Sequence, residues 1–379
     1  MSAGDVWKLV PRAKRIVVKV GSSTLTRDGR LRPDKFTALA RDVSRLLETG
    51  RQVIVVSSGA IAVGAHRLGW PDTGKSIPEK QAAAAVGQIG LVELYQRRFA
   101  RLGHEVGQVL LTRAGLEERE RFLNARRTML MLLRLGVVPI VNENDTIATE
   151  EIRFGDNDNL AATIVNAVEA DLLVILTDVD GLYERAPEAG QPRPPLIRTV
   201  EKITPAIERA ASGTGTRFGS GGMVTKLQAA ENAARSGTAT VLCNGRTGSV
   251  LEKLVTGEQH GTLFAPGQRL RGHKHWLAFT AKTRGRIVID DGAARALQDR
   301  GRSLLPAGIL RIEGTFKIGD SVSCVNDRGD EVARGLVGYS SDEVGRLTGR
   351  ATNEIARVLG YSNGKEIIHR DDLVLVRDS

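Results

Sequence analysis

The sequence has 379 residues, of which 41% are hydrophobic and 26% are charged, and this composition is typical of a soluble globular protein with two or three domains. It contains no apolar run of about 18 residues, and no apolar signal segment precedes the first predicted strand, so we expect a cytoplasmic protein without a membrane span. The two cysteines, Cys243 and Cys324, lie far apart. Disulfide frameworks and paired-cysteine metal or redox sites are therefore excluded.

The formal net charge of +10 is compatible with either nucleic acid or anionic small ligands as partners. The positive charge is not concentrated, because residues 267–379 contain 19 Lys and Arg against 15 Asp and Glu, a net of +4. Aromatic residues make up only 4% of the chain, too few for a base-stacking platform. RNA binding is therefore kept only as the alternative to a small-molecule function.

Two early strands end in loops suited to phosphate. Arg15–Val20 is a short apolar run with Lys19 near its end, and Gly21-Ser22-Ser23 follows. Lys19 is either a side chain that extends out of a strand end or a phosphate ligand, and the backbone N–H groups of the Gly-Ser-Ser loop favour the phosphate. Gln52–Val56 is the second strand, and Ser57-Ser58-Gly59 leads from it into a helix over residues 60–68. An ordinary serine N-cap explains one of these serines, whereas an anion site at the helix N-terminus explains the whole loop.

The segment Gly69–Ser76 (GWPDTGKS) matches the G-x-x-x-x-G-K-S phosphate-binding motif letter for letter. That motif requires a buried strand before it and a helix directly after it. Here the preceding residues have a helical pattern, Pro71 lies inside the loop, and Ile77-Pro78 follows. We therefore reject a phosphate-binding loop at this position.

The middle of the chain carries a concentration of Asp and Asn. A helix over Pro78–Leu102, a strand over Glu105–Thr112 and a helix over Arg119–Leu135 lead to a strand over Val137–Val141. Two polar loops follow, one with Asn142, Glu143, Asn144 and Asp145, the other with Asp156, Asn157, Asp158 and Asn159. Between them, Thr149–Phe154 resembles a hairpin arm. A helix over Leu160–Val168 needs only one N-cap, so Asn157 or Asp158 as that cap leaves the other residues unexplained.

Three further features precede the change in pattern near residue 264. A strand over Asp171–Leu176 ends in Thr177-Asp178. A glycine-dense segment, Gly213–Lys226, runs into a helix over Leu227–Arg235, which brings helix N-terminal N–H groups and a lysine together. A strand over Thr240–Cys243 follows.

These patterns predict an α/β fold with a second, smaller domain. Six apolar strands alternate with helices, which indicates a three-layer, mostly parallel sheet covered on both faces. The polar loops follow the strands, and ligands bind at the carboxyl ends of such strands. After residues 264–267 short strands replace the alternation, at Gly285–Ile289, Ile309–Ile312, Ser321–Val325 and Val332–Leu336. We therefore expect domains over residues 1–265 and 276–379.

The residue types gathered in these loops indicate phosphoryl transfer. Lysines and backbone N–H groups neutralise phosphate, and carboxylates hold Mg²⁺ or orient the lysines. No His or Cys lies in these loops, so nucleophilic triads and zinc chemistry are disfavoured, and His66 and His104 are interpreted as structural. An acceptor that is itself a carboxylate, ionised at pH 7 because its pKa is about 4, needs no general base.

Several motifs closely resemble those of the glutamate 5-kinase family of amino-acid kinases, which catalyses the first step of proline biosynthesis. They are VKVGSS (18–23), VSSGAIAVG (56–64), RERFLNAR (119–126), NENDTIATEEIRFGDNDNLAA (142–162), LLVILTDVDGLY (172–183) and GTRFGSGGMVTKLQAA (215–230). The C-terminal part, with GRIVIDDGAARAL (285–297) and SLLPAGI (303–309), is similar to the appended PUA domain of that family. The resemblance implies the amino-acid kinase fold and phosphorylation of the γ-carboxylate of L-glutamate by ATP.

The resemblance also implies roles for individual residues. The catalytic residues would be Lys19, Lys226 and Asp158. The substrate-binding residues would be Ser58, Asn142, Asp145, Asn157 and Asp156. The ATP-binding residues would be Lys19, Gly21, Ser22, Thr177, Asp178, Ser220, Gly221, Gly222, Met223, Val224, Thr225 and Lys226. Mg²⁺ is the expected cofactor with ATP, proline the expected inhibitor at a pocket overlapping the glutamate site, and a dimer or tetramer the expected assembly; the residues that hold the metal are not implied.

Two alternatives remain open at this stage. One is an amino-acid kinase acting on a different carboxylate or on carbamate. A substrate without a free α-ammonium group would leave Asp145 unpaired. The other is an RNA-binding protein that acts through the PUA-like domain. A reductase that consumes the labile product is a further partner suggested by pathway logic.

Overall fold

The computed structural model describes residues 3–27, 30–147, 157–185, 187, 191–212, 222–267, 277 and 281–376. The chain divides into two compact units, one made of nearly all residues up to 269 and the other of those from 270 onward. Among the described residues no helix combines the length and the apolar character needed to cross a membrane.

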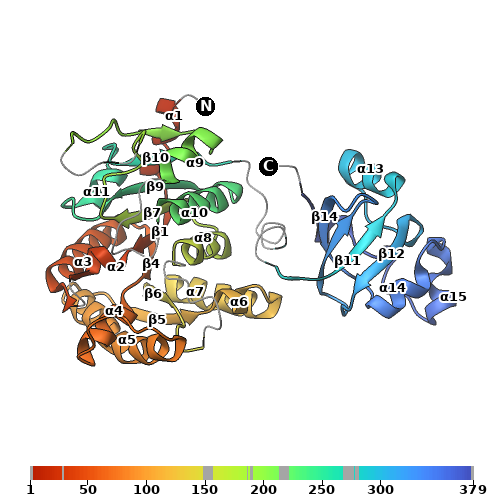
Figure 1. The fold of residues 1–379 in the computed structure, drawn as a ribbon, viewed down its shortest axis with the longest axis horizontal. Coiled ribbons are helices and arrows are strands. Elements are labelled where there is room, and N and C mark those ends of the chain that lie inside the picture. The colour runs from red at the N-terminus through yellow and green to blue at the C-terminus, as the bar shows by residue number, and fades with distance from the viewer. Residues whose placement is uncertain are drawn as a thin grey trace. The chain divides into compact units, whose positions relative to one another are not determined.

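The first unit is built on one eight-stranded sheet in the described part of the chain, with the order β5-β6-β4-β1-β7-β9-β10-β8 (Figure 1). Its strands are β1 Arg15–Val20, β4 Gln52–Ser57, β5 Val106–Leu111, β6 Val138–Glu143, β7 Leu172–Thr177, β8 Thr199–Val200, β9 Ala239–Asn244 and β10 Thr262–Phe264. Neighbouring strands are parallel except at β10, which is antiparallel to β9. A separate two-residue pair, β2 Thr26–Arg27 and β3 Arg30–Leu31, follows β1.

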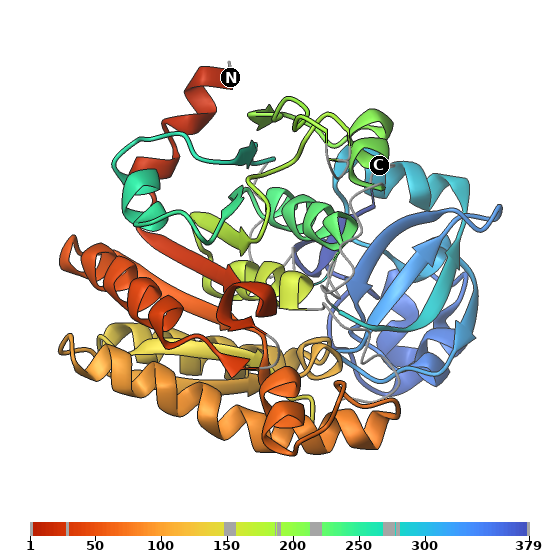
Figure 2. The same ribbon diagram turned by 60° about the vertical axis from the view of Figure 1, so that its left-hand side comes forward.

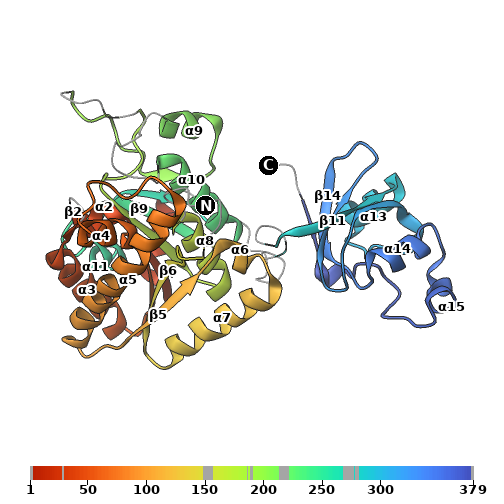
Figure 3. The same cartoon turned by 60° about the horizontal axis from the view of Figure 1, so that its bottom comes forward.

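Helices cover both faces of this sheet, as predicted. They are α1 Ala3–Trp7, α2 Ser22–Leu25, α3 Pro33–Glu48, α4 Ala60–Arg67, α5 Ile77–Ala100, α6 Arg113–Leu116, α7 Arg119–Arg134, α8 Asn157–Val168, α9 Pro205–Ser212, α10 Met223–Arg235 and α11 Val250–Val255. The helices α8 and α10 lie on one face and α3, α5 and α11 on the other (Figures 1 and 3). Because both faces are covered, the central strands are almost continuously apolar, and Ile16, Val17 and Val18 of β1 are at most 1% exposed.

The rejected phosphate-binding motif is the loop that precedes α5. Ser76 is the N-cap of this helix, and its backbone N–H donates to the Glu79 carboxylate at 2.8 Å while Glu79 N–H donates back to Ser76 Oγ at 3.4 Å. This reciprocal pair is a capping box, with Pro78 in the first turn. The Lys75 backbone N–H also donates to the Glu79 carboxylate at 2.7 Å, so the lysine and serine of the motif belong to the start of α5.

The structure corrects several sequence-based expectations. Strands β8 and β10 were not predicted, and α10 begins at Met223 rather than Leu227, so Lys226 lies inside the helix. The alternative interpretation of Asn157 or Asp158 as the N-cap of α8 does not hold, because the helix begins at Asn157 and both residues lie in its first turn. The predicted hairpin over Thr149–Phe154 and most of the predicted link between domains lie outside the described residues.

The second unit has its own five-stranded sheet, strongly curved, in the order β12-β11-β13-β14-β15 (Figure 2). Its strands are β11 Thr283–Ile289, β12 Ile309–Gly314, β13 Ser321–Val325, β14 Glu331–Leu336 and β15 Leu373–Leu375, and its helices α13 Asp291–Arg300, α14 Ser341–Leu347 and α15 Ile355–Leu359. A separate apolar core, which includes Val322, Tyr339 and Ile367, fills this unit. The β-rich character was predicted, whereas β15 and the helices were not.

Candidate active site

The centre of the site is one buried carboxylate held between two lysines. Asp158 is 0% exposed, and its two oxygens lie 2.6 Å from Lys19 Nζ and 3.3 Å from Lys226 Nζ. Thr225 Oγ1 donates a further hydrogen bond of 2.9 Å to the same carboxylate. Both lysines are also buried, at 5% and 7% exposure. The three predicted catalytic residues therefore lie together, although 207 positions separate the first lysine from the second (226 − 19).

Elements on one face of the sheet bring these side chains together. Lys19 is on β1, on the side that α8 packs against, and Asp158 is in the first turn of α8. Lys226 is in the first turns of α10, which packs beside α8. Two parallel helices thus begin next to the carboxyl end of β1, and their N-termini add partial positive charge to that of the lysines. The region is suited to bind a strongly anionic group.

The charges of this cluster are set by competition between burial and pairing. Burial alone would raise the pKa of Asp158, but the ammonium groups of Lys19 and Lys226 outweigh it and hold the pKa below its ordinary value. Burial lowers the pKa of Lys226, while Asp158 acts in the opposite direction. Asp158 is therefore ionised at neutral pH and forms ion pairs with the ammonium groups of both lysines.

A second cluster, made of amide and hydroxyl groups, lies beside the first. The Nδ2 group of Asn157, which has two N–H donors, lies within hydrogen-bond distance of three acceptors: Ser58 Oγ at 2.8 Å, Asn142 Oδ1 at 3.0 Å and the Ser57 carbonyl at 3.1 Å. Asn142 is 2% exposed and donates through Nδ2 to Gln88 Oε1 at 2.8 Å. Asn157 therefore connects two other predicted substrate residues, Ser58 and Asn142, and Gln88 of α5 joins the network through Asn142.

Asp145 stands apart from this network. It is half-buried in the turn after β6, and within the described residues no hydrogen bond or ion pair reaches its carboxylate. Burial raises the pKa of Asp145 to about 6. An acidic group held in this way gains from a cationic partner, because pairing restores the charged form.

The predicted nucleotide residues surround the other side of the lysines. Gly21 lies so close that a Cβ at this position would be 3.9 Å from Lys19 Nζ and 3.6 Å from the Leu176 carbonyl oxygen. At the end of β7, Thr177 Oγ1 donates to Asp178 Oδ1 at 3.1 Å. Gly222 is the N-cap of α10, and its carbonyl oxygen also lies 2.9 Å from Thr225 Oγ1, so it competes with Asp158 for the single hydroxyl proton. Loops from β1, β7 and α10 thus border the same lysines.

Not every predicted residue falls into these clusters. Asp156, Ser220 and Gly221 lie outside the described residues. Val224 lies on the solvent-exposed side of α10, with 47% of its surface exposed. His104, interpreted as structural, shares a hydrogen bond of 2.8 Å with Ser44 away from the site. Within the described chain no group of three His, Cys, Asp or Glu side chains forms a metal-binding cluster.

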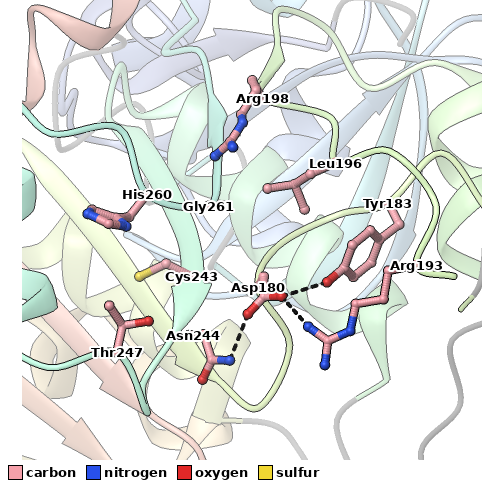
Figure 4. Close-up of a pocket in the computed structure, with 10 residues that line it drawn as sticks. All are labelled: Asp180, Tyr183, Arg193, Leu196, Arg198, Cys243, Asn244, Thr247, His260 and Gly261. Carbon is pink, nitrogen blue, oxygen red and sulfur yellow. Dashed lines mark hydrogen bonds and ion pairs between the residues drawn. The ribbon is translucent and has the colours of Figure 1, made fainter.

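A cavity of about 380 Å³ lies farther along the same edge of the sheet (Figure 4). Asp180, after β7, is its most constrained side chain: it accepts hydrogen bonds from Asn244 Nδ2 at 2.8 Å, from Tyr183 Oη at 2.8 Å and from Arg193 Nη1 at 2.5 Å. These bonds hold the pKa of Asp180 below its ordinary value, the bond from Asn244 most strongly. Since Asn244 pairs in register with Thr177, the cavity begins next to the predicted nucleotide residues.

Sequence reasoning missed Gln88 and the cavity. Glutamine in an amphipathic helix gives no motif, and Gln88 meets Asn142 only because the chain returns 54 residues later. The cavity residues come from separate segments, among them Leu196, Arg198 and His260, which no pattern connected.

Comparison with known proteins identifies two protein families in this chain. The amino acid kinase family matches residues 14–244, and the PUA domain matches residues 285–359. The glutamate 5-kinases of Methylobacillus flagellatus and Geobacter sulfurreducens are each 50% identical to this chain over 370 residues, which cover 97% of this chain and 99% of the relatives. That of Chromobacterium violaceum is 50% identical over 368 residues with the same coverage. The chain therefore belongs to the glutamate 5-kinase branch of the amino acid kinase family and is a phosphotransferase that carries a PUA domain.

Proposed function

We propose that this enzyme transfers the γ-phosphoryl group of ATP to the γ-carboxylate of L-glutamate, giving L-glutamyl 5-phosphate for proline biosynthesis. The observation that carries the proposal is the buried Lys19–Asp158–Lys226 cluster with an amide-lined subsite beside it. The names of the relatives support glutamate as the substrate.

In the proposed reaction, an oxygen of the ionised γ-carboxylate attacks the γ-phosphorus of ATP. The bond from that phosphorus to the bridging oxygen breaks, and its electron pair leaves with ADP, so no proton is transferred. Lys19 and Lys226 neutralise the charge that spreads over the phosphoryl oxygens. Asp158 holds both ammonium groups at fixed positions before substrate arrives, so little reorganisation is needed during the reaction.

The order of the strands supports the placement of the two substrates. The phosphate-binding groups come from β1, β7 and α10, whereas Ser58 and Asn142 follow or end β4 and β6. Glutamate would therefore lie over β4 and β6, with its γ-carboxylate toward Lys19. The ionised Asp145 would pair with its α-ammonium group.

ATP would extend in the opposite direction, over the ends of β7 and β9. Thr177 and Asp178 would contact its phosphates, and the cavity beside Asp180 has a volume in the range that suits a nucleoside. Mg²⁺ would supply charge neutralisation on the phosphates. It usually takes one or two carboxylates and completes its shell with phosphate oxygens and water. Asp178, at the end of β7 beside the proposed phosphates, fits that role.

The test is an ADP-release assay with Mg·ATP and a panel of acids: glutamate, N-acetylglutamate, aspartate and carbamate. Hydroxylamine is included so that any acyl phosphate is trapped as a hydroxamate. We expect turnover with glutamate and hydroxamate formation in proportion to ADP. A Lys226→Met variant controls for contaminating ATPase. Turnover with another acid and none with glutamate would contradict the substrate assignment and would leave the phosphoryl chemistry in place.

Several finer features belong to the same proposal. We expect inhibition by proline at a pocket overlapping the glutamate site, a dimer or tetramer, a cytoplasmic location, and a downstream reductase that consumes the labile acyl phosphate. We keep residues 1–265 and 276–379 as the proposed limits of the kinase and PUA domains. The opposing proposal, RNA binding by the PUA domain, predicts binding to bulk tRNA that weakens steeply as salt rises.

A further inference from the structure

The amide groups of the substrate side form a directed chain of hydrogen bonds. Gln88 Oε1 accepts from Asn142 Nδ2, and Asn142 Oδ1 accepts from Asn157 Nδ2 and from the Glu143 backbone N–H at 2.9 Å. Asn142 therefore has both oxygen and nitrogen engaged by protein atoms. Its side chain acts as the central link of this chain of amides and has little capacity left for substrate.

The two ends of this chain are not satisfied. The Nε2 group of Gln88 and the Oδ1 atom of Asn157 are both shielded from solvent and have no hydrogen-bond partner among the described residues. A buried amide nitrogen or oxygen without a partner is destabilising, because it has lost its hydrogen bonds to water and gained none in return. Gln88 Nε2 offers only N–H donors, and Asn157 Oδ1 offers only an acceptor. A ligand that places an anionic oxygen beside Gln88 satisfies the donor end.

The sheet order says which part of glutamate reaches Gln88. Asn142 is on β6, two strands away from Lys19 on β1, and adjacent strands are about 4.8 Å apart, which puts roughly 10 Å between these backbones. The γ-carboxylate must lie at the Lys19 end, where phosphate is transferred. The α-carboxylate, at the opposite end of the molecule, is then the anionic group on the β6 side.

We propose that Gln88 is a substrate-contacting residue whose Nε2 group donates hydrogen bonds to the α-carboxylate of the amino-acid acceptor, and that it selects for that carboxylate. The proposal rests on glutamate being the acceptor. Asn142 fixes the direction of the Gln88 amide, because its donation to Oε1 turns Nε2 toward the ligand.

The experiment compares Gln88→Glu with the wild-type enzyme on two substrates. This substitution keeps an oxygen for Asn142 and replaces the N–H donors by a second, negatively charged oxygen. The substrates are L-glutamate and its α-amide, which keeps the γ-carboxylate and the α-ammonium but has a neutral amide in place of the α-carboxylate. Gln96→Glu, an exposed residue on the same helix, is the matched control.

We expect Gln88→Glu to raise KM for glutamate about 10- to 100-fold, the usual range for a lost hydrogen bond to a charged group. KM for ATP should not change. The preference for glutamate over its α-amide, taken as the ratio of kcat/KM values, should fall by at least the same factor, because the introduced carboxylate accepts a hydrogen bond from the amide. Gln96→Glu should leave the ratio unchanged.

Equal losses on both substrates would overturn the proposal, because they would mean that Gln88 only positions Asn142. A wild-type enzyme that does not use glutamate would instead refute the proposed function. Should Gln88→Glu not fold, Gln88→Met removes the donors without adding charge, and the same ratio decides the question. Circular dichroism and KM for ATP confirm folding in either variant.

Discussion

At the scale of single residues, the surroundings of Asp158 and Asp145 shift the pKa values of these two carboxylates in opposite directions. Asp158 is fully buried but paired with two lysines, so its pKa is low. Asp145 is half-buried and unpaired in the described part of the chain, so burial raises its pKa to about 6. Asp158 is suited to carry a permanent negative charge within the site. Asp145 is suited to become charged when a cationic group of the substrate pairs with it.

This difference predicts how activity depends on pH. Because the folded-state pKa of Asp145 is above its ordinary value, its carboxylate gains a proton as pH falls through about 6. We expect kcat/KM for glutamate to fall below that pH, since this ratio reports groups of the free enzyme. Asp145→Asn should raise KM for glutamate and remove the step near pH 6.

The measurement is a pH profile of kcat/KM for glutamate from pH 5 to 8, with KM for ATP as the control. An Asp145→Asn enzyme with an unchanged KM for glutamate would contradict the assignment of this residue. The Asp158 charge should not contribute in this window. Its folded-state pKa is below the unfolded value, so the stability it contributes is present above the unfolded value and is lost only in more acidic solution.

Sequence alone predicted the residues whose chemistry is unusual for their position. A lysine within an apolar strand and a dense cluster of Asp and Asn are visible without coordinates. Lys19 and the cluster were singled out in this way, whereas the individual roles of Asn142 and Asp158 came from the resemblance to the glutamate 5-kinase family. Gln88 was not identified, because its proposed role depends on the hydrogen bond that its amide oxygen accepts from Asn142, which is distant in the sequence. Patterns of residue type carry no information of that kind.

At the scale of elements, the substrate side depends on two helices in direct backbone contact. A Cβ added to Gly87 of α5 would lie 1.9 Å from the Ala60 carbonyl oxygen, and one added to Gly64 of α4 would lie 1.7 Å from that of Ala83. Because α4 follows the Ser58 loop and α5 carries Gln88, this contact sets the distance between two parts of the proposed glutamate subsite.

We expect Gly87→Ala to force α4 and α5 apart. Overpacking of this kind costs about 1–3 kcal/mol in the free energy of unfolding, and KM for glutamate should rise because Gln88 moves with its helix. Urea unfolding and steady-state kinetics measure the two effects. The control is Gly248→Ala, since an added Cβ there meets nothing within 4 Å. Equal behaviour of the two variants would contradict the close contact.

The elements predicted best were those with long apolar runs. The strands from β1 to β7 in the central sheet agree with prediction to within about one or two residues, as usual for boundaries set by burial. Strands β8 and β10 have only two and three residues, too short for a periodic signal. The start of α10 was not predicted because the glycine-rich sequence before it has the composition of a loop. In the structure the helix already begins at Met223, whose side chain is buried.

At the scale of the whole molecule, each unit has a core of its own. The second unit is organised around Tyr339, which is 0% exposed and donates a hydrogen bond of 2.7 Å from Oη to the Gly364 carbonyl. We expect Tyr339→Ala to destabilise this unit by about 3–5 kcal/mol, as for other large buried aromatic residues, and to leave KM for glutamate and ATP unchanged.

Differential scanning calorimetry should resolve the effect as a shift of one transition. Ile318→Ala is the control, because Ile318 belongs to the same unit and is 53% exposed. If both transitions moved together, or if KM for either substrate rose in the Tyr339 variant, the units would not be independent in stability.

The central position of β1 has a consequence for how the chain is made. One edge of β1 pairs with β4, which leaves the ribosome soon afterwards, but the other pairs with β7, which starts only at Leu172. At about 5–20 residues per second, this edge waits roughly 8–30 seconds for its partner during synthesis. Unpaired strand edges recruit other chains. We therefore expect the β7-pairing edge of β1 to be available to other chains during this interval of synthesis.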